Sequence, residues 1–227
     1  MIGLMTLYKI LSLGFAYPDE ENWNMIENIL TRNEDFFEGD LSAQVEGFKR
    51  YFMENRDKID DLKSEYLTIF DVGREIVPYE TEYMREKVSR KAFELADIAG
   101  FYSAFGFSVN DEVKNKEALD HMAVELEFMA LLEWKEQYAK EKGQMENVGI
   151  VRDAKMKFLK EHLAKWGFLY CRRIYGLKGA GFYIRLAKIL ECVLALQCER
   201  YHIDTSLLDS EMTRDSHSGV RSDELTC

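Results

Sequence analysis

The chain is almost free of residues that interrupt helices. Its 227 residues include only two prolines, Pro18 and Pro78, and long stretches contain no glycine. Proline and glycine are the residues that a helix tolerates least, and a fold of many short strands needs them at its turns. This scarcity favours long helices over a β fold with many turns.

Apolar residues recur at helical spacing along nearly the whole chain. A first helix would end before Pro18, and Asp19 is placed to cap a second. Further stripes predict helices that include residues 45–52, 62–70 and 88–93, the last of them ending at 97–100, and helices at about 119–142, 151–175 and 182–201, with residues 176–181 as a connector. We therefore expect an all-α fold, a single globular multi-helix bundle over residues 1–204, and a polar C-terminal tail over 205–227.

The composition and the cysteines limit the class of protein. Hydrophobic residues make up 47% of the chain, enough for a sizeable core, and the four cysteines form no CxxC pair. The first seventeen residues lack a basic leading region and include Lys9, so they predict an amphipathic helix rather than a secretory signal. No segment approaches the ~18 uninterrupted apolar residues of a membrane span. We expect a cytoplasmic protein with reduced thiols and no integral membrane segment.

Charge is unevenly distributed. The net charge is −11, but residues 150–190 contain ten Lys and Arg against Asp153 and Glu161. An acidic body argues against nucleic-acid binding and suits a cationic partner, such as a basic leader peptide. The basic block has two interpretations: it balances acidic helices of the same molecule, or it forms a second contact surface. In either case we expect five of its members to face solvent or partners: Arg152, Lys155, Lys160, Lys165 and Arg172.

Residues 117–129 carry the strongest chemical signal. His121 and Glu125 lie one helical turn apart, as a general base or a metal site requires, but neither a second His at ligand spacing nor an HExxH motif is present. Three interpretations remain open: Asp120 caps a helix while His121 bonds a carboxylate, the segment binds a peptide, or it binds metal for catalysis. His162, which shares an apolar stripe with Phe158, is expected to be a core histidine with its hydrogen bonds satisfied.

A second distinctive segment is Pro78-Tyr79-Glu80-Thr81-Glu82-Tyr83. Tyr79 and Tyr83 are one turn apart, and Glu80 is expected to begin a helix. The segment is either a loop pinned to the bundle by its aromatic rings or the rim of a groove for an apolar, basic peptide.

Several motifs in order resemble those of one family. Glu65-Tyr66-Leu67-Thr68-Ile69-Phe70 comes first, the 78–83 segment follows, then Glu117-x-x-Asp120-His121 with residues 125–129, and finally Phe158, His162 and Trp166. In this order they resemble the TorD/DmsD/NarJ family of molybdoenzyme-specific (redox enzyme maturation) chaperones. The chain departs from the family at Ala118 and Leu119, where proline is common, and this concerns the shape of that loop.

The resemblance implies a TorD-like, cofactor-free chaperone that is not an enzyme. Its partners would be the apo-form catalytic subunit of a molybdopterin oxidoreductase and its twin-arginine leader peptide, held until the cofactor is inserted and before export. The protein itself would be a monomer or a homodimer. The residues expected to bind the leader or client are Tyr66, Ile69, Phe70, Tyr79, Glu80, Tyr83, Glu117, Asp120, His121 and Glu125. Among them, Asp120 and His121 are expected to lie outside the core.

Two other classes of function compete with this one. One is a helical metal-dependent hydrolase that uses His121 and Glu125. The other is a permanent structural subunit of a reductase complex. Stoichiometric metal would favour the first, and co-purification with a reductase at fixed stoichiometry would favour the second.

Overall fold

The computed structural model describes residues 3–32, 39–84, 87–109 and 118–206, and 78% of these residues are helical. The helices are α1 (Leu4–Phe15), α2 (Glu20–Arg32), α3 (Gly39–Glu54), α4 (Ile59–Tyr66), α5 (Lys87–Ala104), α6 (Met122–Glu141), α7 (Met145–Phe158), α8 (Ala164–Tyr175) and α9 (Gly181–Arg200). Two π-helical turns, η1 (Leu67–Asp71) and η3 (Leu159–Leu163), and one 3-10 turn, η2 (Glu80–Glu82), complete the set. The prediction of an all-α fold is confirmed.

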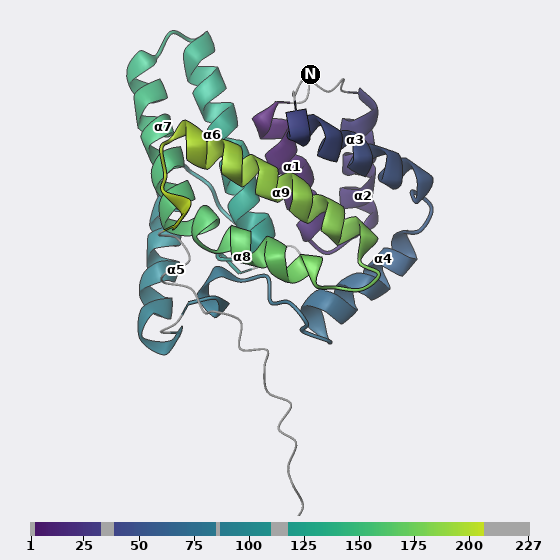
Figure 1. Ribbon diagram of the computed structural model, residues 1–227. Coiled ribbons are helices and arrows are strands. Elements are labelled where there is room, and N and C mark those ends of the chain that lie inside the picture. Colours follow the sequence, from purple (N-terminus) through teal and green to yellow (C-terminus); the bar gives the residue numbers. More distant parts are fainter. Residues whose placement is uncertain (1–2, 33–38, 85–86, 110–117, 207–227) are drawn as a thin grey trace, which may run out of the picture.

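The helices form one bundle around α1 and α9 (Figure 1). α1 packs along α6 and also contacts α2 and α9, while α3 and α8 lie against α9. α6 and α7 form a hairpin on one side of the bundle, and α5 lies below that hairpin in the view of Figure 1. Between α4 and α5 the chain crosses the base of the bundle through η2, which contacts α5.

Close helix contacts depend on two glycines. A Cβ added to Gly14 of α1 would lie 2.6 Å from a methyl group of Leu186, and one added to Gly167 of α8 would lie 2.7 Å from Leu194. Both leucines belong to α9, so these glycines let α1 and α8 approach it. The largest side chains of the core include Phe128 and Trp166, both fully buried. Burial of an apolar side chain of this size contributes roughly 1.5–3 kcal/mol.

Several predicted helix ends are confirmed. The Asp19 carboxylate accepts a hydrogen bond from the backbone N–H of Asn22 at 2.8 Å, as expected of a cap. α6 ends directly before Lys142 and Gly143, and Gly143 adopts a positive φ of 68° that glycine accommodates without strain. The connector between α8 and α9 also lies where it was predicted.

Other boundaries were wrong. The helix predicted from residue 151 begins at Met145, and the π-helical turn η3 divides it before α8. The helix α5 does not end at residues 97–100 but continues to Ala104, because Tyr102 is buried against Phe128 and Phe158. Phe93, which marked this helix in the sequence, is 77% exposed.

No helix among the described residues is long and apolar enough to cross a membrane. The predicted tail over 205–227 lies almost wholly outside the described residues, which end at residue 206. Its separation from the bundle therefore stays a prediction.

Candidate functional site

The two segments that carry the family-like motifs lie side by side. Glu80 donates its backbone N–H to the carbonyl oxygen of Asp120 at 2.9 Å, and Met122 donates to the carbonyl oxygen of Pro78 at 2.9 Å. Between these bonds the rings of Tyr79 and His121 meet edge to face, with centroids 5.1 Å apart. Residues 78–81 are therefore fixed against the start of α6.

Asp120 strengthens this junction through its side chain. Its Oδ2 accepts hydrogen bonds from the Thr81 hydroxyl at 2.6 Å and from the Thr81 backbone N–H at 3.2 Å. Only 2% of Asp120 is exposed. The carboxylate thus joins the 78–83 segment to α6 and does not cap the helix, which corrects the structural interpretation made from the sequence.

His121 takes the capping role instead. Its Nδ1 accepts a hydrogen bond from the backbone N–H of Ala123 at 3.1 Å, and α6 begins at the next residue, Met122. Burial lowers the pKa of His121 from 6.5 to about 3, so the imidazole is neutral at neutral pH. The expectation that Asp120 and His121 lie outside the core was wrong, since the cap and the Thr81 contact both draw them inside.

A second group of polar side chains lies in the interior behind Glu80. His162 Nδ1 is 3.1 Å from Glu80 Oε2, and its Nε2 is 3.0 Å from Asp97 Oδ2. Glu94 Oε2 lies 4.0 Å from the same Nδ1. His162 and Glu80 are fully buried. The prediction that His162 is a core histidine with satisfied hydrogen bonds is confirmed.

Glu125 extends this group from α6. The Trp166 indole N–H donates to Glu125 Oε2 at 3.2 Å, and the side chain is fully buried. Burial, followed by the charge of Glu80, raises the pKa of Glu125 well above its ordinary value, which favours the neutral acid. Burial lowers the pKa of His162, but the hydrogen bonds and charges of Glu80 and Asp97 outweigh it and raise that pKa overall. The acidic side chains of the cluster therefore favour the protonated, positively charged form of His162.

The aromatic residues of the predicted site belong to the same interior. Tyr66 and Phe70 pack on each other with ring centroids 5.1 Å apart, and Tyr170 lies between Phe70 and Tyr83 at 6.4 Å from each. Tyr83 in turn packs on Trp166 at 5.0 Å, which is the residue that bonds Glu125. One connected set of rings thus leads from η1 to the buried carboxyl groups.

The structure brings most of the predicted residues together, but below the surface. Buried members are Tyr66, Ile69, Phe70, Glu80, Tyr83, Asp120, His121 and Glu125. Tyr79 is half-buried. Glu117 lies outside the described residues.

Sequence reasoning missed Glu94 and Asp97 as partners of His162. The two are three residues apart on α5 and so share one face of that helix. That spacing was the signal available in the sequence. The spacing could not identify His162 as their partner, because His162 lies on a different helical segment, 65 residues after Asp97.

Part of the basic block forms ion pairs with acidic residues of the same molecule. Lys155 is fully buried, with Nζ 2.8 Å from Glu133 and bonded to Glu136, and Arg152 contacts Glu136 at 2.7 Å. Burial raises the pKa of Glu136, but hydrogen bonds from Lys140, Lys155 and Arg152 outweigh it and lower the pKa to about 2. The expectation that Lys155 faces solvent was wrong, because it lies one turn before Phe158 on the face of α7 that packs on α6.

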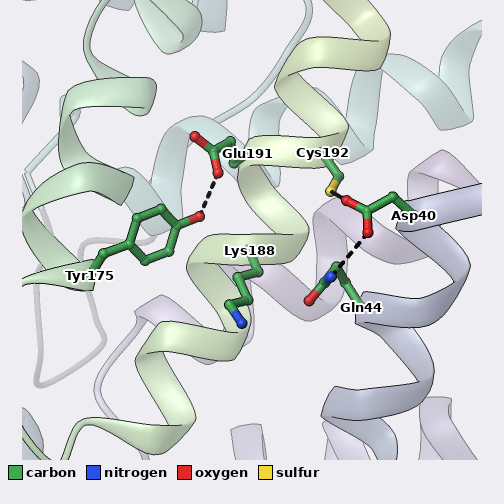
Figure 2. A pocket seen from close by; sticks show the side chains of 6 residues that line it. All are labelled: Asp40, Gln44, Tyr175, Lys188, Glu191 and Cys192. Carbon is green, nitrogen blue, oxygen red and sulfur yellow. Dashed lines mark hydrogen bonds between the residues drawn. The ribbon is translucent and has the colours of Figure 1, made fainter.

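A separate hollow of about 280 Å³ lies between α3, α8 and α9, and none of the residues predicted to bind the leader or client lines it (Figure 2). Its polar groups contact one another: Tyr175 donates to Glu191 at 2.7 Å, and the Cys192 thiol lies 3.3 Å from Asp40. Burial, helped by the bond to Asp40, raises the pKa of Cys192 to about 11, so the thiol is protonated and a poor nucleophile.

Comparison with known families places the chain. A model of the family described as nitrate reductase delta subunit matches residues 34–172, which is more than half of the chain and includes the whole cluster around Glu80 and Asp120. No curated protein matches the sequence. The match agrees with the resemblance drawn from the motifs. The chain therefore belongs to the nitrate reductase delta subunit family, a family of chaperones for the maturation of molybdoenzymes.

Proposed function

We propose that this chain binds the catalytic subunit of a molybdenum-containing oxidoreductase, through its twin-arginine leader, and assists cofactor insertion before export. Family membership supports the general role. The observation that carries the leader site is the junction of Thr81 with Asp120. It gathers acidic and aromatic groups of two motif segments in one place.

A leader of this class offers two arginines followed by an apolar run. Asp120, Glu80 and Glu125 are the acidic groups suited to the arginines, and Tyr79 and Tyr83 suit the apolar run. A charge-assisted hydrogen bond of this kind contributes about 1.5–3 kcal/mol. The proposal needs no catalytic step, and it places the chaperone in the cytoplasm, where the leader is still attached.

Binding at this site requires the segment of residues 77–84 to move. In the closed state Asp120 is satisfied by Thr81, and Glu80 and Glu125 are buried. We infer that a leader arginine displaces Thr81 from Asp120 while the segment opens. Leu67 of η1 and Val72 directly after it precede the segment in the chain, and their exposed side chains offer apolar surface to the leader. This makes leader binding a competition with a contact inside the protein.

The experiment is titration of a synthetic twin-arginine leader peptide into the purified chain by calorimetry. The matched control peptide has both arginines replaced by lysines, because lysine keeps the charge but loses the bidentate geometry. We expect the arginine peptide to bind at least tenfold more tightly, and its affinity to fall with added salt since exposed charges are screened over about 8 Å at physiological ionic strength. Equal affinity for both peptides, or affinity that salt does not change, would contradict the proposed recognition.

A further inference from the structure

Glu80, Glu94 and His162 come from three separate segments, η2, α5 and η3, and meet in the interior. Each offers one ligand atom, and these atoms lie within 4.8 Å of one another. We propose that this group is a binding site for a divalent transition-metal cation such as Zn²⁺. The inference goes beyond the proposed function and does not rest on leader binding.

The distances suit a cation placed between the three side chains. Ligand atoms about 2.0–2.2 Å from a tetrahedral Zn²⁺ are roughly 3.4 Å apart. Here Nδ1 of His162 is 3.1 Å from Glu80 Oε2 and 4.0 Å from Glu94 Oε2. The Glu80 and Glu94 ligand atoms are at most 4.8 Å apart, so shifts of about an ångström would bring all three into a first coordination shell. The cation would replace the proton now shared between Nδ1 and Glu80.

The outer contacts of His162 match those of a metal ligand. Its second nitrogen, Nε2, lies 3.0 Å from the Asp97 carboxylate. A ligating histidine usually donates its other N–H to a carboxylate, which fixes the ring and makes the ligating nitrogen more basic. Asp97 therefore holds Nδ1 toward Glu80 and Glu94.

Glu94 divides its two oxygens between different partners. Its Oε1 contacts Arg90 at 3.2 Å and Lys165 at 3.9 Å, whereas Oε2 is the atom that faces His162. The two basic side chains thus anchor the carboxylate from outside and leave the inner oxygen to the site.

Glu125 adds an independent observation. It is fully buried next to Glu80, with which it shares a side-chain hydrogen bond, and its Oε1 has no other hydrogen-bond partner in the described part of the chain. Two buried carboxyl groups in contact repel each other when both are ionised, so a cation beside them is favourable. Glu125 is outside the group of three ligand atoms that lie within 4.8 Å of one another, and after a shift toward the cation it would be the third oxygen ligand of the site. A cation held by these residues joins η2, α5, η3 and α6, and it stabilises the closed position of the 77–84 segment.

The test is titration of Zn²⁺ and Co²⁺ alone into tag-free protein that has been stripped with a chelator. We expect one equivalent to bind and to raise the midpoint of thermal unfolding. The Co²⁺ complex should lack a sulfur-to-metal charge-transfer band, because the site offers nitrogen and oxygen only. That absence distinguishes this site from binding at the cysteines.

Two variants and a control locate the site. Glu94→Gln removes a ligand charge, and Asp97→Asn alters the outer partner of His162 at a side chain that is 57% exposed, so at least the second is expected to fold. Each should weaken Zn²⁺ binding at least tenfold, whereas Glu161→Gln, an exposed carboxylate on η3, should not. Failure of the folded wild-type protein to bind one equivalent would overturn the proposal. So would affinity unchanged in a folded Asp97→Asn or Glu94→Gln variant, or a thiolate band with Co²⁺.

Discussion

The Thr81 hydroxyl donates a 2.6 Å hydrogen bond to the carboxylate of Asp120, 39 residues further along the chain. This contact and the adjoining backbone bonds hold the 78–83 segment against the start of α6. Both residues are buried, so neither meets a partner unless the segment moves. Binding at the proposed leader site would therefore require this hydrogen bond to break.

Replacing Asp120 with alanine should destabilise the protein. The change leaves the buried hydroxyl and N–H of Thr81 without their acceptor, and hydrogen bonds to a charged group contribute about 1.5–3 kcal/mol each. In urea unfolding, the free energy of unfolding of this variant should be lower than that of the wild type by at least this amount. The control is Asp204→Ala, which removes a similar pair of bonds to Ser206 at an exposed position and should change stability little. Equal effects of the two substitutions would show that the Thr81 contact does not stabilise the fold.

Thr81→Val tests whether leader binding requires opening. Valine keeps the size of the side chain but cannot donate to Asp120, so the closed state loses stability relative to the open one. A ligand that binds the open state then binds more tightly, about tenfold for each 1.4 kcal/mol of that shift. We expect a higher leader affinity by calorimetry, with Thr31→Val on α2 as the control whose hydroxyl bonds only its own helix. An unchanged or lower affinity in the folded Thr81 variant would mean that the closed form binds.

The sequence predicted the helices well but misjudged which polar residues are buried. Apolar spacing depends on neighbours within one helix, and it located α1, α9 and the C-terminal end of α8 closely. Lys155 shows the limit: its charge suggested solvent, but the partners that allow its burial, Glu133 and Glu136, lie on a different helix. The same reason hides the site, since His162 meets Glu80 across 82 residues of sequence.

His121 makes the protein sensitive to acid. Its pKa is about 3 in the folded state because it is buried, below its ordinary 6.5, so the unfolded chain binds the proton first as pH falls. As pH falls from about 6.5 to about 3, His121 therefore lowers the free energy of unfolding by about 1.4 kcal/mol for each pH unit. His121→Asn retains a capping side chain without that proton, so its unfolding free energy should fall less steeply over this range than that of wild type. Parallel pH curves for the two proteins, with exposed His202→Asn as reference, would rule out this role.

Lys155→Met should destabilise the α6–α7 hairpin. The substitution keeps the apolar stem but leaves the buried Glu136 with one cation fewer, and breaking a buried ion pair costs about 3–5 kcal/mol. Lys157→Met is the matched control, two residues away, because its partner Asp153 is exposed and the change should have little effect. Thermal unfolding measures both. If both variants unfold at the same temperature, the buried network is not what the basic block contributes.

The most direct test of the proposed role is capture of the chain from the cells that make it, with identification of bound proteins and assay of their cofactor. The account predicts the catalytic subunit of a molybdenum-containing oxidoreductase, without molybdopterin, bound by the wild type and lost when its twin-arginine pair is replaced by lysines. Capture of a cofactor-loaded reductase at fixed stoichiometry, or of no molybdoenzyme in cells that express one, would contradict it.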